Sequence, residues 1–164
     1  TVWFAIPFYC AYLWYSTKKN GRLTGGALFV VAVVVATLAG PFLLWDGQAF
    51  LNSTIWYLSG NTANSYPVSG YGLGMLLYGA GAIKNIHDTY PFAVWQALLG
   101  IPVLFVTLRW LQKKPSMARL LLGYTVFLGV VWWASRYFNN SHLGFLGSLL
   151  VLGITKYWDE ERLT

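Results

Sequence analysis

Charged residues and cysteine are both scarce in this sequence. Only 10% of its 164 residues are charged, whereas 57% are hydrophobic. Water-soluble domains carry about 25% charged residues, so a soluble globular domain and a disordered chain are both excluded. The single cysteine, Cys10, cannot close an internal disulfide or build a thiolate metal site. The composition therefore predicts a polytopic membrane protein.

The sequence also has few acidic residues, and its positive charge is unevenly placed. Eleven Lys and Arg against five Asp and Glu give a net charge of +6. No basic stretch is long enough to follow a phosphate backbone, which excludes nucleic acid as a partner. The basic residues instead fill gaps between apolar runs, as the positive-inside rule describes, so we expect anionic membrane lipids as partners. The two main gaps contain Lys18, Lys19 and Arg22, and Arg109, Lys113, Lys114 and Arg119.

Six apolar runs are present where a membrane helix needs about 20 residues. The third run is short and rich in glycine, and if it crossed the membrane the two basic gaps would lie on opposite sides. We therefore expect an all-α, polytopic transmembrane helical bundle with five spans plus a re-entrant or short sixth segment. Both basic gaps and the C-terminal tail would then be cytoplasmic. The runs cover residues 2–16, 25–45, 70–83, 91–110, 120–135 and 143–158.

The longest segment between spans extends from residue 46 to residue 69. Its apolar residues have helical spacing, which predicts a short amphipathic helix lying in the membrane interface. These residues are Phe50, Leu51, Ile55 and Leu58.

The chain is expected to form a single transmembrane domain over residues 1–164. No internal repeat or soluble domain is evident in the sequence. Thr1 is not an initiator residue, and an apolar run begins at once without a basic segment or a small-residue cleavage site. We therefore expect the sequence to be the C-terminal part of a longer chain.

The most polar stretch between two apolar runs covers residues 136–142. It combines a cation, two amides and an imidazole in Arg136, Asn139, Asn140 and His142. A guanidinium can hold phosphate oxygens, amides can bond sugar hydroxyls, and an imidazole can exchange a proton near neutral pH. A simple polar turn between two helices explains the same composition, so both interpretations stay open.

Three other polar features have weaker signals. Asp46 follows Trp45 at the end of the second run, either as a solvated carboxylate or as an acid facing a ligand. His87 and Asp88 are adjacent, and adjacent side chains rarely point to one place. The glycine-rich residues 66–74 can bring backbone amides close to an anion.

No metal site is predicted, and the cofactor is left open. The sequence has no HExxH, GxSxG or paired-cysteine motif. Its two histidines can in principle ligate a haem or pigment, but neither lies in the middle of an apolar run.

The order of four short stretches resembles the C-terminal half of bacterial membrane glycosyltransferases of the GT-C type. The resemblance covers most of residues 38–158. The stretches are GPFLLWD at 40–46, YPV with GYGLG at 66–74, YPF at 90–92 and SRYFN at 135–139.

This resemblance implies transfer of a sugar from a polyprenyl-phosphate donor, at the outer face of the bacterial inner membrane, with inversion at the anomeric carbon. The catalytic acid of such enzymes lies in an external loop near the N-terminus that this sequence does not contain, so the segment alone is not expected to be catalytic. The resemblance places Arg136, Asn139, Asn140 and His142 around the lipid phosphate or acceptor. It places Asp46 and Tyr66 in the same external cavity.

Two other functions remain open. A non-catalytic integral subunit of a larger respiratory or photosynthetic membrane complex agrees with the short length, the 18% aromatic content and the missing catalytic loop. A transporter fragment agrees with the glycine-rich third run, but no charge lies in the middle of a span and no repeat is visible.

Overall fold

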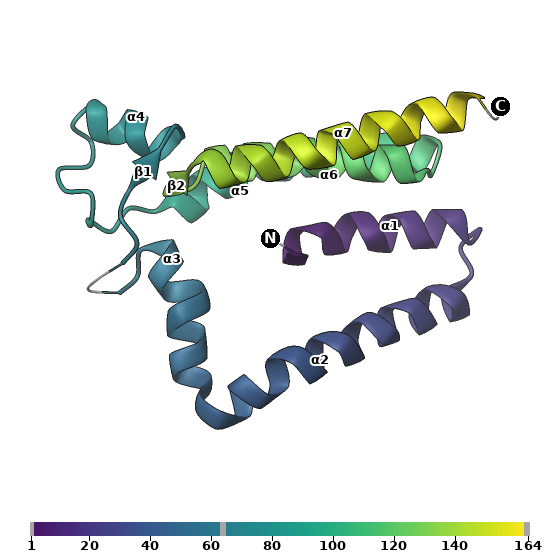
Figure 1. Cartoon of the computed structure of the whole chain (residues 1–164), viewed down its shortest axis with the longest axis horizontal. Coiled ribbons are helices and arrows are strands. Elements are labelled where there is room, and N and C mark those ends of the chain that lie inside the picture. The colour runs from purple at the N-terminus through teal and green to yellow at the C-terminus, as the bar shows by residue number, and fades with distance from the viewer. Residues whose placement is uncertain (1, 63–64, 163–164) are drawn as a thin grey trace.

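The computed structural model describes residues 2–62 and 65–162, and 77% of the chain is helical (Figure 1). The predicted helical class is therefore confirmed, apart from one parallel pair of two-residue strands. The elements are η1 Val2–Ala5, α1 Ile6–Ser16, α2 Gly21–Leu51, the π-helix η2 Asn52–Trp56, α3 Tyr57–Ser59, β1 Ser69–Gly70, α4 Leu73–Gly79, α5 Phe92–Lys113, α6 Met117–Trp133, β2 Tyr137–Phe138 and α7 Asn140–Arg162.

Helices α5, α6 and α7 form a packed layer in which α6 contacts both neighbours. Helix α1 lies along this layer and packs on α5 and α6 (Figure 1). The core between them is built from Phe8 of α1, Leu111 of α5, and Tyr124, Phe127 and Leu128 of α6. Ring contacts join Phe8 to Tyr124 and Phe127 at centroid distances of 5.8 and 5.6 Å.

Two helices are long and apolar enough to span a membrane, namely Gly21–Ser59 and Phe92–Lys113. No residue in the most apolar window of the first helix is buried. An apolar helix in a water-soluble protein is normally buried in the core, so an exposed one indicates contact with lipid or another apolar surface. These helices indicate a membrane protein. Helix α6, with 17 residues, is also apolar but shorter.

The third apolar run forms only the short helix α4. A helix of its seven residues is about 10 Å long, whereas the hydrocarbon core of a bilayer is about 30 Å thick. Helix α4 lies beyond the end of the α5–α7 layer, next to β1 (Figure 1). Its neighbours Val68, Ile83 and Phe92 form a second, smaller core.

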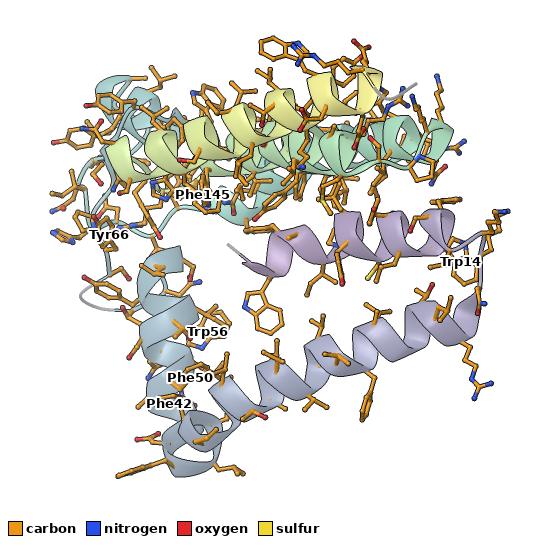
Figure 2. All side chains as sticks on the ribbon, turned by 45° about the vertical axis from the view of Figure 1, so that its right-hand side comes forward. Trp14, Phe42, Phe50, Trp56, Tyr66 and Phe145 are labelled. Atoms are coloured by element: carbon orange, nitrogen blue, oxygen red, sulfur yellow. The ribbon has the colours of Figure 1, made fainter. Side chains whose placement is uncertain are left out.

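The predicted separate interfacial helix is instead the continuation of α2 after a sharp bend. Asp46 leaves the helical conformation, with φ −150° and ψ 84°, and its Oδ1 accepts a hydrogen bond of 2.9 Å from the amide of Ala49. The side chain therefore caps the helix that restarts after it. Phe42 and Phe50 stack across the bend with centroids 6.1 Å apart (Figure 2).

Basic side chains gather at one end of the molecule. The turn between α1 and α2, the turn between α5 and α6, and the C-terminus all lie at that end (Figure 1). These segments carry nine of the eleven Lys and Arg, and the other two, Lys84 and Arg136, belong to the opposite end. Both basic gaps and the tail thus lie at the same end of the molecule.

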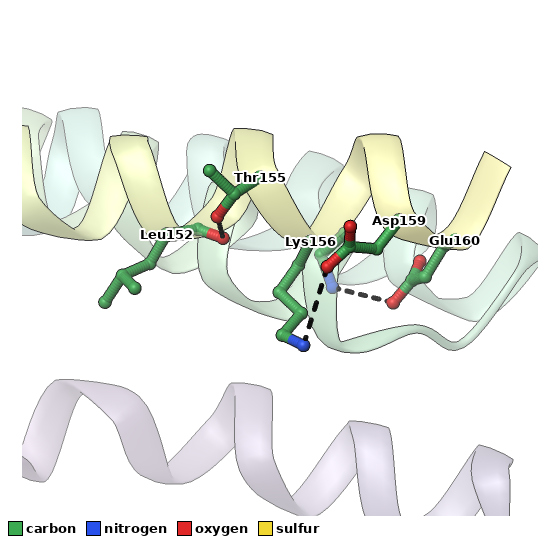
Figure 3. A network of polar contacts seen from close by, with 6 residues as sticks. Leu152, Thr155, Lys156, Asp159 and Glu160 are labelled. Carbon is green, nitrogen blue, oxygen red and sulfur yellow. Dashed lines mark hydrogen bonds and ion pairs between the residues drawn. The ribbon is translucent and has the colours of Figure 1, made fainter. Parts of the chain in front are cut away.

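An acidic residue of α7 joins that helix to the start of α6 at the basic end. Glu160 accepts a hydrogen bond of 3.2 Å from the amide of Ala118, in the first turn of α6 (Figure 3). A carboxylate at a helix N-terminus is stabilised by the free amides and by the helix dipole. The neighbouring ion pair of Lys156 and Asp159, 3.9 Å apart and exposed, contributes little by comparison.

The two short strands at the other end depend on glycine. β1 pairs with β2 so that Ser69 lies opposite Tyr137 and Gly70 opposite Phe138. Gly70 has a φ of +90°, and a Cβ there would lie 1.7 Å from the carbonyl oxygen of Phe138. Backbone therefore packs directly on backbone, which only glycine permits.

We expect Gly70→Ala to destabilise the protein by about 3 kcal/mol, because it adds both a backbone clash and a strained φ. Gly79→Ala is the matched control, since a Cβ at that helical position meets nothing within 4 Å. Thermal unfolding in detergent measures both variants. Equal melting temperatures for the two would contradict the observed strand contact.

Candidate functional site

The candidate site begins with a tight turn after α6. The Ser135 hydroxyl lies 2.6 Å from the carbonyl oxygens of both Trp132 and Tyr137, and this fixes the path of the chain into β2. The turn directs Arg136 back toward the 60–90 segment, where its bonding partners lie 48 to 70 positions earlier in the sequence. Arg136 is only 2% exposed and is among the most buried large side chains of the described residues.

The guanidinium of Arg136 bonds to backbone carbonyls of the 60–90 segment. Nη1 donates to the carbonyl of Asp88 at 2.7 Å and Nη2 to that of Ile86 at 2.9 Å, while Nε donates to Tyr66. These bonds use three of the five N–H donors of the group. Burial lowers the pKa of Arg136 from its ordinary value, and the Asp88 carboxylate partly opposes this shift.

The loop that receives Arg136 is also held by its own side chains. The Asp88 carboxylate accepts a bond of 2.8 Å from the amide of Asn85, and the His87 Nδ1 lies 3.1 Å from the carbonyl oxygen of Ser65. The side chains of His87 and Asp88 therefore bond to different backbone groups, and the described contacts do not join them as an acid and base pair.

His142 occupies an aromatic cage in the first turn of α7. Its ring lies 4.5 Å from that of Trp132, 5.3 Å from Tyr137 and 5.9 Å from Phe138, measured between centroids. Its Nδ1 lies 2.6 Å from Oδ1 of Asn139. The backbone amide of Asn139 also donates to this Nδ1 at 3.3 Å, so both hydrogen-bond contacts of Nδ1 are with Asn139.

Tyr66 joins the same cluster from the opposite segment. Its ring lies 4.6 Å from that of Tyr137 and 6.1 Å from that of Tyr57 in α3, measured between centroids. Figure 2 shows Tyr66 close to the end of the α5–α7 layer, well above the bend marked by Phe42 and Phe50. Burial, followed by the proximity of Tyr66, raises the pKa of Tyr137.

A cavity of about 660 Å³ lies beside these residues. One side is formed by η2 and α3, another by residues 89–96, and the third by the end of α6 and the start of α7. The described residues that line it include amides, hydroxyls and aromatic rings, but no Asp or Glu. Its polar side chains include Asn61, Thr89, Gln96, Ser135, Arg136 and His142.

The structure brings some of the predicted site residues together and separates others. Arg136 and His142 line the cavity, and Asn139 and Tyr66 contact them. Asn140 is exposed and is not among the described lining residues. Asp46 caps the restarted helix, which extends about 20 Å further to Ser59 at 1.5 Å per residue.

The sequence analysis did not identify Gln96 as a site residue. Its Nε2 donates to the carbonyl oxygen of Val131 at 3.1 Å, so it joins α5 to the end of α6 at the cavity. A polar amide inside an otherwise apolar run was the available signal. The glycine-rich residues 66–74 were predicted to approach an anion, and their Gly70, Gly72 and Gly74 instead lie against backbone atoms of residues 133–139.

No protein-family model matches this sequence, and searches of curated proteins and of solved structures found no similar protein. The proposed function therefore depends on the geometry of the cavity and on the distribution of charge.

We expect Arg136→Ala to loosen the 60–90 segment, because three backbone carbonyls would lose their charged donor. An unsatisfied buried polar group costs about 1–3 kcal/mol. Limited proteolysis in detergent should then cleave within this segment much faster than in the wild type. Arg136→Lys should restore little protection, since one ammonium cannot replace a planar fork. The exposed Lys84→Ala is the control, and equal cleavage of all variants would contradict the bracing role.

Proposed function

We propose that the chain is the membrane-embedded part of a GT-C-like glycosyltransferase and that the polar cavity binds the phosphate or sugar of a polyprenyl-linked donor. The observation that supports this is the cavity lining, which contains Arg136, His142 and Gln96 and no described carboxylate. An anionic phosphate avoids carboxylates and favours a guanidinium. Among the described residues, two N–H groups of Arg136 have no protein acceptor.

The cavity residues supply binding groups more clearly than catalytic ones. Sugar transfer needs a base for the acceptor hydroxyl and a positive site for the departing phosphate. Arg136 supplies positive charge, and the amides of Asn61 and Gln96 suit hydroxyl groups. We therefore assign no catalytic residue to the chain and give these side chains a role in holding the donor or acceptor.

The proposed topology has five spans in the bacterial inner membrane. The spans are η1 with α1, α2, α5, α6 and α7, while α4 stays outside the membrane core. The gathering of Lys and Arg at one end supports a cytoplasmic position for that end, by the positive-inside rule. The cavity then faces outward, as a site for a lipid-linked donor on the outer side requires. The short spans need their flanking Arg and Lys to extend toward the head groups.

A non-catalytic subunit of a larger membrane complex is the second candidate function. The observation that favours it is the exposure of α2, whose apolar side chains make few contacts within the chain. A partner subunit would cover such a surface as lipid does.

Ligand binding distinguishes the two functions. In nanodiscs, we expect a polyprenyl phosphate to bind more tightly than the uncharged polyprenol. His142→Ala and Gln96→Ala should each weaken binding about tenfold, which corresponds to the loss of one hydrogen bond. Asn140→Ala, an exposed neighbour, is the matched control. Equal binding of phosphate and alcohol would exclude the phosphate site, and copurification at fixed stoichiometry with another membrane protein would then favour the subunit.

Thiol labelling tests the topology. In a Cys10→Ser background, we expect Asn85→Cys to react with an impermeant reagent added to intact cells, because it lies at the cavity end. Lys114→Cys, at the basic end, should react only after the membrane is permeabilised. Labelling of both positions from the same side would overturn the proposed orientation.

A further inference from the structure

An apolar groove runs between α1 and α2, apart from the polar cavity. Its volume is about 610 Å³, and its lining is almost wholly hydrophobic. On α2 the lining residues follow helical spacing and form one face of the helix. They are Leu28, Val31, Ala32, Val35 and Ala36.

The same face of α2 continues to the basic end. Thr24, one turn before Leu28, lines a smaller pocket of about 350 Å³ together with Cys10, Trp14 and Gln112. The hydroxyl oxygens of Thr24 and Thr17 are 3.2 Å apart, so a hydrogen bond joins the end of α1 to α2. From Thr24 to Ala36 the face is about 18 Å long, at 1.5 Å per residue.

Cations lie near the smaller pocket, at the Thr24 end of this face of α2. Lys18 and Lys19 lie in the turn between α1 and α2, and Arg22 lies two residues before Thr24; all three are exposed. Lys113 and Lys114 follow Gln112 at the end of α5. The face of α2 is therefore apolar from Leu28 to Ala36 and has a cluster of cations near its Thr24 end.

We infer that this groove binds one anionic phospholipid of the bilayer, with an acyl chain between α1 and α2 and the phosphate at the basic end. The α2 face from Thr24 to Ala36, about 18 Å long, is close to the depth of one leaflet, which is half of a hydrocarbon core about 30 Å thick. Clustered Lys and Arg at the end of a membrane helix attract anionic head groups. The site lies at the opposite end from the polar cavity and does not depend on the proposed sugar transfer.

The charge pattern favours a phospholipid over other occupants of an apolar groove. A partner helix would need no cluster of cations at one end of its binding surface. A neutral lipid would gain nothing from them. An anionic phospholipid satisfies both parts of the site at once, since its tail is apolar and its head carries negative charge.

Native mass spectrometry of the wild-type protein tests the site by measuring how much phosphatidylglycerol and phosphatidylcholine it retains. We expect the wild type to retain phosphatidylglycerol preferentially. Val31→Trp, which fills the groove, should lower retention at least about fivefold, whereas Val34→Trp, on the exposed side of α2, should not. Replacing Lys18, Lys19 and Arg22 by Gln should reduce the preference by about fivefold per charge. Lys84→Gln, at the other end, is the charge control.

Photo-crosslinking provides a second measurement on the unmodified chain. Phosphatidylglycerol with a diazirine on its acyl chain should label Val31 and Val35 in preference to Val30 and Val34. Uniform labelling around α2, or equal retention of the two lipids by the wild type, would overturn the inference. So would unchanged lipid retention in Val31→Trp, which would leave the groove to a protein partner.

Discussion

The buried guanidinium of Arg136 is the interaction on which the cavity end of the protein depends. A buried charge is tolerated only where hydrogen bonds replace its lost water, and here three carbonyls from the 60–90 segment do so. Because these carbonyls belong to Tyr66, Ile86 and Asp88, one side chain fixes the segment at two separate places. The aromatic contacts of Tyr66 with Tyr137 follow from this arrangement.

Elsewhere the main core is confined to the contacts among α1, α5 and α6. Helix α2 buries only Thr24 among its described residues and exposes many apolar side chains. Such a molecule gains stability in water only by associating with something apolar, whereas in a bilayer the exposed Phe, Leu and Val of α2 are already in a favourable solvent. The shape of the molecule, with α2 bent away at Asp46, is therefore compatible with lipid filling the space around it.

The sequence predicted the helices because apolar runs are visible in composition, and the two basic gaps that it assigned to one side lie at the same end of the molecule. It could not predict what Arg136 bonds to, since its partners lie about fifty to seventy residues away and are backbone atoms, which every residue carries. The same holds for Gly70, whose neighbour is a backbone oxygen of Phe138. The resemblance placed Asp46 in the external cavity, whereas the residue lies at the bend of α2. The sequence did not reveal this bend, because it depends on the φ and ψ of a single residue.

The cations at the two ends of the molecule differ in burial, and this difference affects ligand binding. At the basic end the cations are mostly exposed and can bind a head group without any change in the fold. At the cavity end the buried cation, Arg136, already binds the 60–90 segment through three of its donors. A phosphate that bonded to the remaining N–H groups would share a guanidinium with the 60–90 segment, so ligand binding and the order of that segment would be thermodynamically coupled. Selectivity at the cavity would then depend on the bracing of Arg136 as much as on the lining groups themselves.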